Sequence, residues 1–107
     1  MLVRLKGELV KDTIYKYDKK VINKLEDLKN CHLVLNVMNL TTIDYKGINK
    51  LLYVYEIIKR KQGKTLLCGN NSNIKKKLKK SRILNYIYET KDEINAMKII
   101  NEGRKNG

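Results

Sequence analysis

The chain has 107 residues, the size of one domain, and its 24 Lys and Arg against 11 Asp and Glu give a formal net charge of +13. With 42% hydrophobic and 33% charged residues, and no Pro, Trp or Phe, the composition excludes a membrane-spanning protein and a Pro-rich disordered one. The apolar runs are too short for a transmembrane helix, and Arg4 and Lys6 interrupt the start of a signal segment. We therefore expect one cytoplasmic domain over residues 1–102 and a flexible tail over residues 103–107.

The first half of the chain predicts a strand, a helix and a second strand. Apolar and polar residues alternate over 2–9, which is typical of a strand with one buried face. From Ile14 to Leu28 apolar residues recur every third or fourth position, which predicts a helix over 14–28 with Thr13 as its N-cap. The apolar run 32–37 predicts a central strand covered on both faces, followed by a turn over 39–43.

The second half continues this alternation. Asp44 is the expected N-cap of a helix that extends to Ile58 and that Gly63 ends. Strands are predicted over 65–68 and 86–89, with a short basic helix between them. A last helix is expected to face the core through Ile94, Met97 and Ile100. The order predicts an α/β fold with a mostly parallel sheet of four strands, or five, and about four helices.

Catalytic and metal-binding motifs are lacking in the sequence. His32, the single histidine, starts a buried strand, and Ser72 and Ser81 lack a partner base at motif spacing, so no hydrolase triad is expected. The segment 63–65 resembles the end of a phosphate-binding loop, but a helix precedes it and a strand follows. Cys31 and Cys68 form no CxxC motif. We expect no enzyme activity, no metal and no other cofactor.

The densest positive patch follows the third strand. Its candidate residues are Lys75, Lys76, Lys77, Lys79, Lys80 and Arg82. One interpretation is a site for nucleic acid or another acidic surface, and the other is a solvated helix face. A protein that binds single strands also needs aromatic rings between its cations, and here Tyr86 and Tyr88 fall on the following strand.

The segment 41–47 is the main candidate site, because ligands and partners bind beyond the carboxyl ends of strands in open α/β sheets. Gly47 would allow another backbone to come close. The alternative is that Asp44 is only an N-cap and Gly47 only a turn residue. The candidate partner-binding residues are Thr41, Thr42, Asp44, Tyr45, Lys46, Gly47 and Lys50.

From about residue 3 to residue 100 the chain resembles a STAS domain of the anti-sigma factor antagonist family. The residues that carry the resemblance are Gly7-Glu8-Leu9, Thr13, Leu33-Val34-Leu35-Asn36, Leu40, Ile43-Asp44, Gly47, Gly63 to Cys68, and the segment from Ile74 to Tyr88. The resemblance implies a non-enzymatic bacterial transcription regulator. Such a protein binds an ATP-dependent serine kinase that otherwise holds a sigma factor, and so releases that factor.

The family's switch is a serine in the pattern Asp-Ser-(Ser/Thr)-Gly, which the kinase phosphorylates. Here the pattern is Asp44-Tyr45-Lys46-Gly47, so Tyr45 occupies the position of the serine. A phenol places its hydroxyl several ångströms farther out, and Lys46 and Lys50 would partly neutralise a phosphate. We therefore expect binding to an anti-sigma factor kinase without the usual switch.

Two other functions stay open. The first is binding of nucleic acid or an acidic surface through residues 75–82. The second is the role of a STAS adaptor subunit in a transport or stress-signalling assembly. Thr41 and Thr42 also remain possible acceptors of phosphate beside Tyr45.

Overall fold

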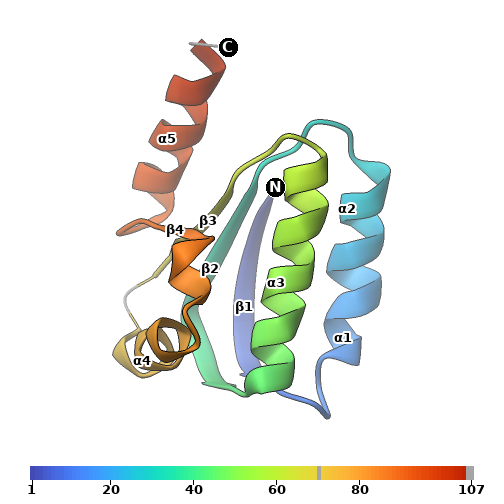
Figure 1. Ribbon diagram of the computed structural model, residues 1–107, viewed down its shortest axis with the longest axis vertical. Coiled ribbons are helices and arrows are strands. Elements are labelled where there is room, and N and C mark those ends of the chain that lie inside the picture. The colour runs from blue at the N-terminus through green and yellow to red at the C-terminus, as the bar shows by residue number, and fades with distance from the viewer. Residues whose placement is uncertain (70, 106–107) are drawn as a thin grey trace.

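One sheet of four parallel strands lies at the centre of the computed structural model, which describes residues 1–69 and 71–105, without the side chains at 19, 20 and 103–105 (Figure 1). The strands are β1 (Leu2–Leu9), β2 (Leu33–Ile43), β3 (Thr65–Cys68) and β4 (Tyr88–Glu89), in the spatial order β1-β2-β3-β4. Each neighbouring pair is parallel, as the alternation of strands and helices predicted.

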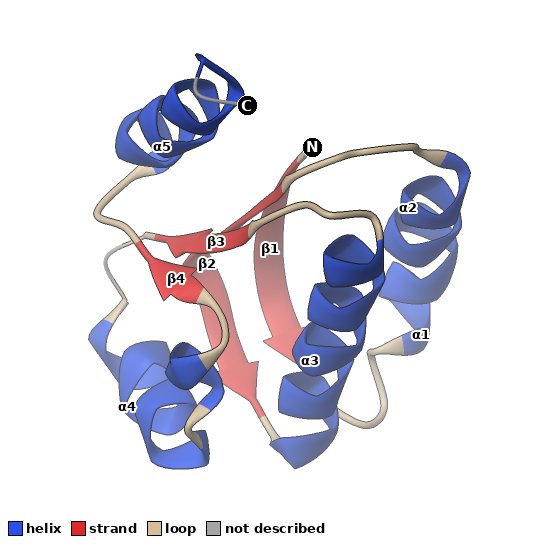
Figure 2. Cartoon of the chain, turned by 45° about the horizontal axis from the view of Figure 1, so that its top comes forward, coloured by secondary structure: helices blue, strands red, loops and turns tan. Residues whose placement is uncertain are grey.

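Helices cover both faces of the sheet. They are α1 (Tyr15–Tyr17), the π-helix η1 (Asp18–Ile22), α2 (Asn23–Asp27), α3 (Tyr45–Arg60), α4 (Ser72–Ser81), the 3-10 helix η2 (Ile83–Asn85) and α5 (Glu93–Lys105). Side chains of α2, α3 and α4 pack in one core with Leu33 and Leu35 of β2. On the opposite face α5 buries Ala96 and Ile100 against Val34 and Leu66, and Figure 2 shows α5 apart from α2 and α3.

The second strand is much longer than expected. β2 continues to Ile43, through the segment that the sequence analysis assigned to a turn, and three of its last four residues pair with β1: Leu40 with Gly7, Thr42 with Glu8 and Ile43 with Leu9. The register shifts between Arg4 and Lys6 and again between Gly7 and Glu8. These irregularities change which side chains face the core, so the polar residues of this segment do not alternate as in a regular strand.

The predicted helix over 14–28 is present but interrupted. The π-helix η1 divides it into α1 and α2, which gives five α-helices in the described residues where about four were expected. The prediction that Thr13 caps this helix was wrong. Its hydroxyl donates to the carbonyl of Glu8 (2.7 Å) and accepts from the backbone N–H of Val10 (3.1 Å), and the helix has no side-chain cap.

The end of α3 also differs from the expectation. Gln62, not Gly63, adopts the left-handed conformation (φ 61°), and the N–H groups of Gln62 and Gly63 bond to Lys59 and Ile58. Gly63 serves another purpose: a Cβ there would lie 1.9 Å from the carbonyl oxygen of Cys31. Glycine is needed at 63 because two segments of backbone meet there.

The last helix faces the core with a different stripe. Ile100 is buried as expected, but Ile94 and Met97 are 70% and 46% exposed, and Ala96 is fully buried instead. The prediction considered only large apolar side chains as core residues. Where the helix lies close to the sheet, the small side chain of Ala96 fits instead.

The last strand and the last helix differ in length from the prediction. β4 covers only Tyr88–Glu89 of the predicted strand over 86–89. α5 continues to Lys105, so residues 103–105 of the predicted tail are helical in their backbone, and residues 106–107 lie outside the described part. Among the described helices, none combines the length and the apolar character needed to cross a membrane.

Candidate functional site

Asp44 joins the start of α3 to the end of β1. One carboxylate oxygen, Oδ1, accepts a hydrogen bond from the backbone N–H of Gly47 (2.9 Å), which makes Asp44 the N-cap of α3. The other oxygen, Oδ2, accepts from the backbone N–H of Lys11 (3.0 Å) in the loop after β1. Both hydrogen bonds lower the pKa of Asp44, and the one from Lys11 has the larger effect. The carboxylate therefore fixes two segments that lie far apart in the sequence.

Gly47 is buried at the contact between α3 and β1. A Cβ at this position would lie 2.1 Å from the carbonyl oxygen of Leu9 and 2.9 Å from Cγ1 of Ile43. The backbone that comes close to Gly47 is therefore the chain's own. The glycine lets the first turn of α3 pack against the sheet, and it leaves the residues just before it on the outside.

Tyr45 and Lys46 are those outer residues. Tyr45 is 67% exposed, and Lys46 is exposed with its Nζ 5.5 Å from the centre of the Tyr45 ring. A cation in the first helical turn is unfavourable for the helix dipole, and this turn contains no acidic residue. Neither side chain contributes to the core, so their contribution to the stability of the fold is small.

The two threonines of the segment 41–47 lie at the end of β2 and not in a loop. The hydroxyl of Thr41 donates to the carbonyl of Gly7 (3.0 Å), and Thr42 is half-buried. With Asp44, Tyr45, Lys46 and Gly47 they belong to the segment 41–47, which we call the α3 start. Six of the seven predicted partner-binding residues lie in this segment, and of these Thr41, Tyr45 and Lys46 are exposed.

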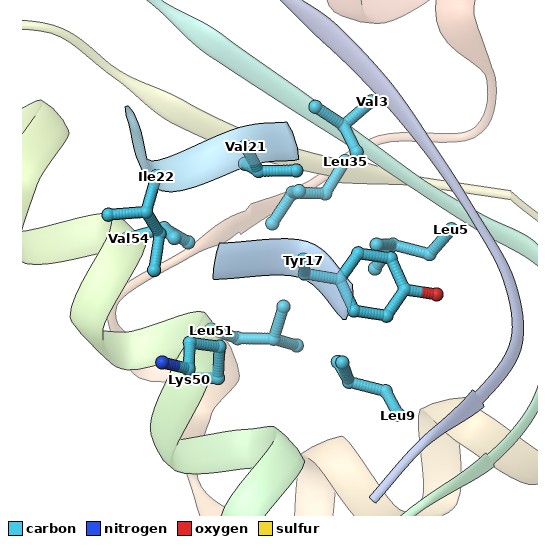
Figure 3. A pocket seen from close by; sticks show the side chains of 10 residues that line it. All are labelled: Val3, Leu5, Leu9, Tyr17, Val21, Ile22, Leu35, Lys50, Leu51 and Val54. Carbon is cyan, nitrogen blue, oxygen red and sulfur yellow. The ribbon is translucent and has the colours of Figure 1, made fainter. Parts of the chain in front are cut away.

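The seventh residue, Lys50, is engaged elsewhere. Its Nζ lies 2.7 Å from Oδ1 of Asp18 in the π-helix, and its side chain is 24% exposed. Its apolar stem borders a small cavity of about 20 Å³, which is room for roughly one water molecule (Figure 3). The other side chains around it are apolar apart from the hydroxyl of Tyr17, which donates to the carbonyl of Lys6 (2.9 Å). This cavity is too small for a cofactor.

The basic residues in and directly after α4 differ in their contacts. Lys75 forms an ion pair with Glu89 (2.6 Å), and Lys77 donates from Nζ to the carbonyl of Ile43 (3.3 Å), directly before Asp44. Lys76, Lys79, Lys80 and Arg82 are exposed. Lys77 therefore adds a positive charge beside the α3 start.

Sequence reasoning missed three neighbours of the candidate site: Lys11, Lys77 and Asp18. Lys11 contributes its backbone N–H, which no side-chain pattern indicates. Asp18 contacts Lys50 of α3, and Lys77 contacts the carbonyl of Ile43 at the end of β2. Both contacts join residues far apart in the sequence, so the local pattern around either residue does not indicate them. Only the three-dimensional arrangement identifies them.

Comparisons with known proteins bear on the family and the fold of the chain. The model of the STAS domain family matches residues 1–97. Over 97 residues the chain is 27% identical to the anti-sigma F factor antagonist of Paenibacillus polymyxa, covering 91% of this chain and 83% of that protein.

Solved structures show the same fold. A Thermotoga maritima protein assigned as an anti-sigma factor antagonist superposes with a TM-score of 0.83 at 17% identity, covering 94% of this chain and 87% of the other. The anti-sigma factor antagonist SpoIIAA in its unphosphorylated form gives a TM-score of 0.70 at 16% identity, with the same coverage.

Proposed function

Because this chain belongs to the STAS domain family, we propose that it acts as an anti-sigma factor antagonist that binds an ATP-binding anti-sigma factor kinase through the α3 start. The likeness to the Paenibacillus polymyxa antagonist supports this class of function. In this function the chain is a binding partner and carries out no reaction of its own.

The observation that carries the proposal is the exposed pair Tyr45 and Lys46 on a rigid support. Asp44 and Gly47 fix the helix start through contacts with Lys11 and Leu9, so the backbone that carries the two outer side chains is held in place. An exposed tyrosine supplies a large contact area at low entropic cost, and such residues dominate many interfaces.

The positive charges near Tyr45 indicate the charge of the partner's surface. Lys46 lies beside Tyr45, and Lys77 reaches the carbonyl of Ile43. The Asp44 carboxylate caps the N-terminus of α3, so the positive charge of this surface comes from the two lysines. The complementary partner surface is acidic, and association is faster at low salt than at high salt.

We also propose that this chain has lost the phosphoserine switch. Tyr45 stands where the family's serine is expected. Its phenol is farther from the backbone than a serine hydroxyl, and Lys46 would offset part of a phosphate's charge. Binding is then constitutive and is not ended by phosphorylation.

Titration calorimetry with the full chain tests the proposal. Each ATP-binding anti-sigma factor kinase of the same organism is titrated with and without ATP or ADP, and one of them is expected to form a complex. Tyr45→Ala and Lys46→Glu are expected to weaken it at least about tenfold.

Matched controls come from the same helix. Tyr53 is 47% exposed and Lys59 is exposed near the other end of α3, so Tyr53→Ala and Lys59→Glu should leave the affinity unchanged. The absence of a complex with every kinase in every nucleotide state would rule the proposal out.

A further inference from the structure

A groove of about 390 Å³ lies near the far end of α3 from the α3 start. It is bordered by the end of α3, the connection from α3 to β3, the start of β3, the strand β4 with the residues before it, and the helix α5. We call it the tyrosine groove, and its lining residues are Tyr55, Lys59, Gly63, Lys64, Thr65, Leu66, Tyr86, Tyr88 and Ile99.

Three tyrosine rings from two parts of the chain meet at this groove. Tyr86 and Tyr88 are 61% and 62% exposed, although aromatic rings normally bury most of their area. The ring centres of Tyr55 and Tyr86 are 6.0 Å apart, with an angle of 51° between the planes. Two accessible rings and a third beside them provide flat apolar faces on which planar groups stack.

Two lysines border the same groove. Lys59 places its Nζ 5.9 Å from the centre of the Tyr55 ring, and Lys64 is exposed at the connection to β3. No lining residue of the groove is acidic, and the ion pairs found in the described residues use other side chains. The charges of Lys59 and Lys64 are therefore not offset by an ion pair at the groove.

Thr65 is a buried residue beside the groove. The residue is 5% exposed, and its hydroxyl has no hydrogen-bond partner among the described residues. A buried hydroxyl without a partner is uncommon, because leaving it unpaired costs free energy. The hydroxyl oxygen is itself buried, so the contacts open to a ligand are those of the tyrosine rings and the two lysines.

We propose that the tyrosine groove binds single-stranded nucleic acid. Bases stack on tyrosine rings and lysines contact phosphates, and this combination recognises unpaired strands. The net charge of +13 attracts a polyanion to the chain as a whole. A duplex hides the faces of its bases, so it cannot use the rings.

This site is separate from the one proposed for the kinase. Tyr45 and Lys59 are fourteen residues apart on one helix, which is about 20 Å at 1.5 Å per residue. A variant of either site therefore leaves the other intact, and the two proposals fail or succeed independently.

Fluorescence anisotropy with labelled 12-residue single strands of RNA and of DNA tests the inference, with duplexes of the same sequence and mononucleotides as competitors. Tyr86→Ala and Tyr88→Ala are each expected to weaken binding roughly 5- to 150-fold. Lys59→Gln and Lys64→Gln should each reduce the slope of log affinity against log salt by about 0.7.

The matched controls are Tyr53→Ala, an exposed tyrosine on α3 that does not line the groove, and Lys24→Gln, an exposed lysine on α2. Both should bind as the unmodified chain does, and circular dichroism verifies that each variant folds. Three results would overturn the inference. The first is no binding to single strands at 50 mM salt, and the second is that the Tyr86 and Tyr88 variants bind as tightly as the unmodified chain. The third is that duplexes or mononucleotides bind as tightly as single strands.

Discussion

Gly47 in the first turn of α3 packs directly against the carbonyl group of Leu9 at the end of β1, with no space between them for a side chain. Because this contact positions the start of α3, it also determines where Tyr45 and Lys46 are presented. The structure of the α3 start therefore requires glycine at position 47.

Gly47→Ala should lower the free energy of unfolding by about 1–3 kcal/mol or more, because the new Cβ meets backbone that cannot move aside. Urea denaturation measures the loss. Gly7→Ala is the contrasting variant: a Cβ there would have open space within 4 Å, so its cost comes from the φ of 77° and not from a clash. Equal stability of the Gly47 variant and the original chain would contradict the packing argument.

Asp44 gives the stability of this segment a pH dependence. Hydrogen bonds from Lys11 and Gly47 depress its pKa in the folded chain, so its contribution is complete above the ordinary value of about 3.9 and is lost as the pH falls through the lower folded value. Asp44→Asn removes this titration. Its stability deficit relative to the unmodified chain should be constant from pH 7 to pH 5 and should shrink below about pH 4.

Chemical denaturation of both proteins across this range measures the difference. Glu93, whose pKa is lowered first by its hydrogen bond from Arg4, is present in both and cancels. Asp44→Ala, which also removes the cap, should lower Tm by roughly 4–8 °C at pH 7. A deficit that grows toward low pH would contradict the assignment.

Tyr45→Ser should restore the switch that we propose this chain has lost. Serine brings the hydroxyl close to the backbone at the position where the family's kinase acts, and phosphate there should weaken the complex by repulsion and desolvation. Mass spectrometry identifies the modified residue and calorimetry measures the affinity. The double variant Tyr45→Ser with Lys46→Ser should lose more affinity on phosphorylation, because Lys46 no longer offsets the charge.

The unmodified chain is the control for this experiment, and we expect no phosphate on Tyr45, Thr41 or Thr42 after incubation with the same kinase. Phosphate on Tyr45 that ends binding would show that the switch is intact.

Gln62→Gly should stabilise the chain by about 1 kcal/mol, because Gln62 holds the left-handed conformation after α3 at a steric cost that glycine does not have. Gln62→Ala keeps a Cβ and should give no gain. Thermal unfolding compares the three proteins. Gly63→Ala, one residue later, should instead be destabilising, since its Cβ would meet the carbonyl of Cys31.

Local patterns in the sequence predicted much of the scaffold. Alternation indicated β1 over 2–9 and the apolar run indicated β3 over 65–68, and both agree with the structure. Asp44 was recognised as the cap of α3 because capping depends on residues three positions apart. Such features are determined by neighbours along the chain, so the sequence contains them directly.

Other features depend on partners that are distant in sequence. β2 extends to Ile43 because β1 pairs with it there, and Ala96 rather than Met97 faces the sheet because α5 lies close to it. The tyrosine groove exists because α3 ends beside the start of β4, which brings Tyr55 to Tyr86. The sequence by itself therefore determined the order of strands and helices and the identity of the exposed pair Tyr45 and Lys46. Only the tertiary structure decided which distant groups meet, because those contacts depend on packing geometry that no local periodicity records.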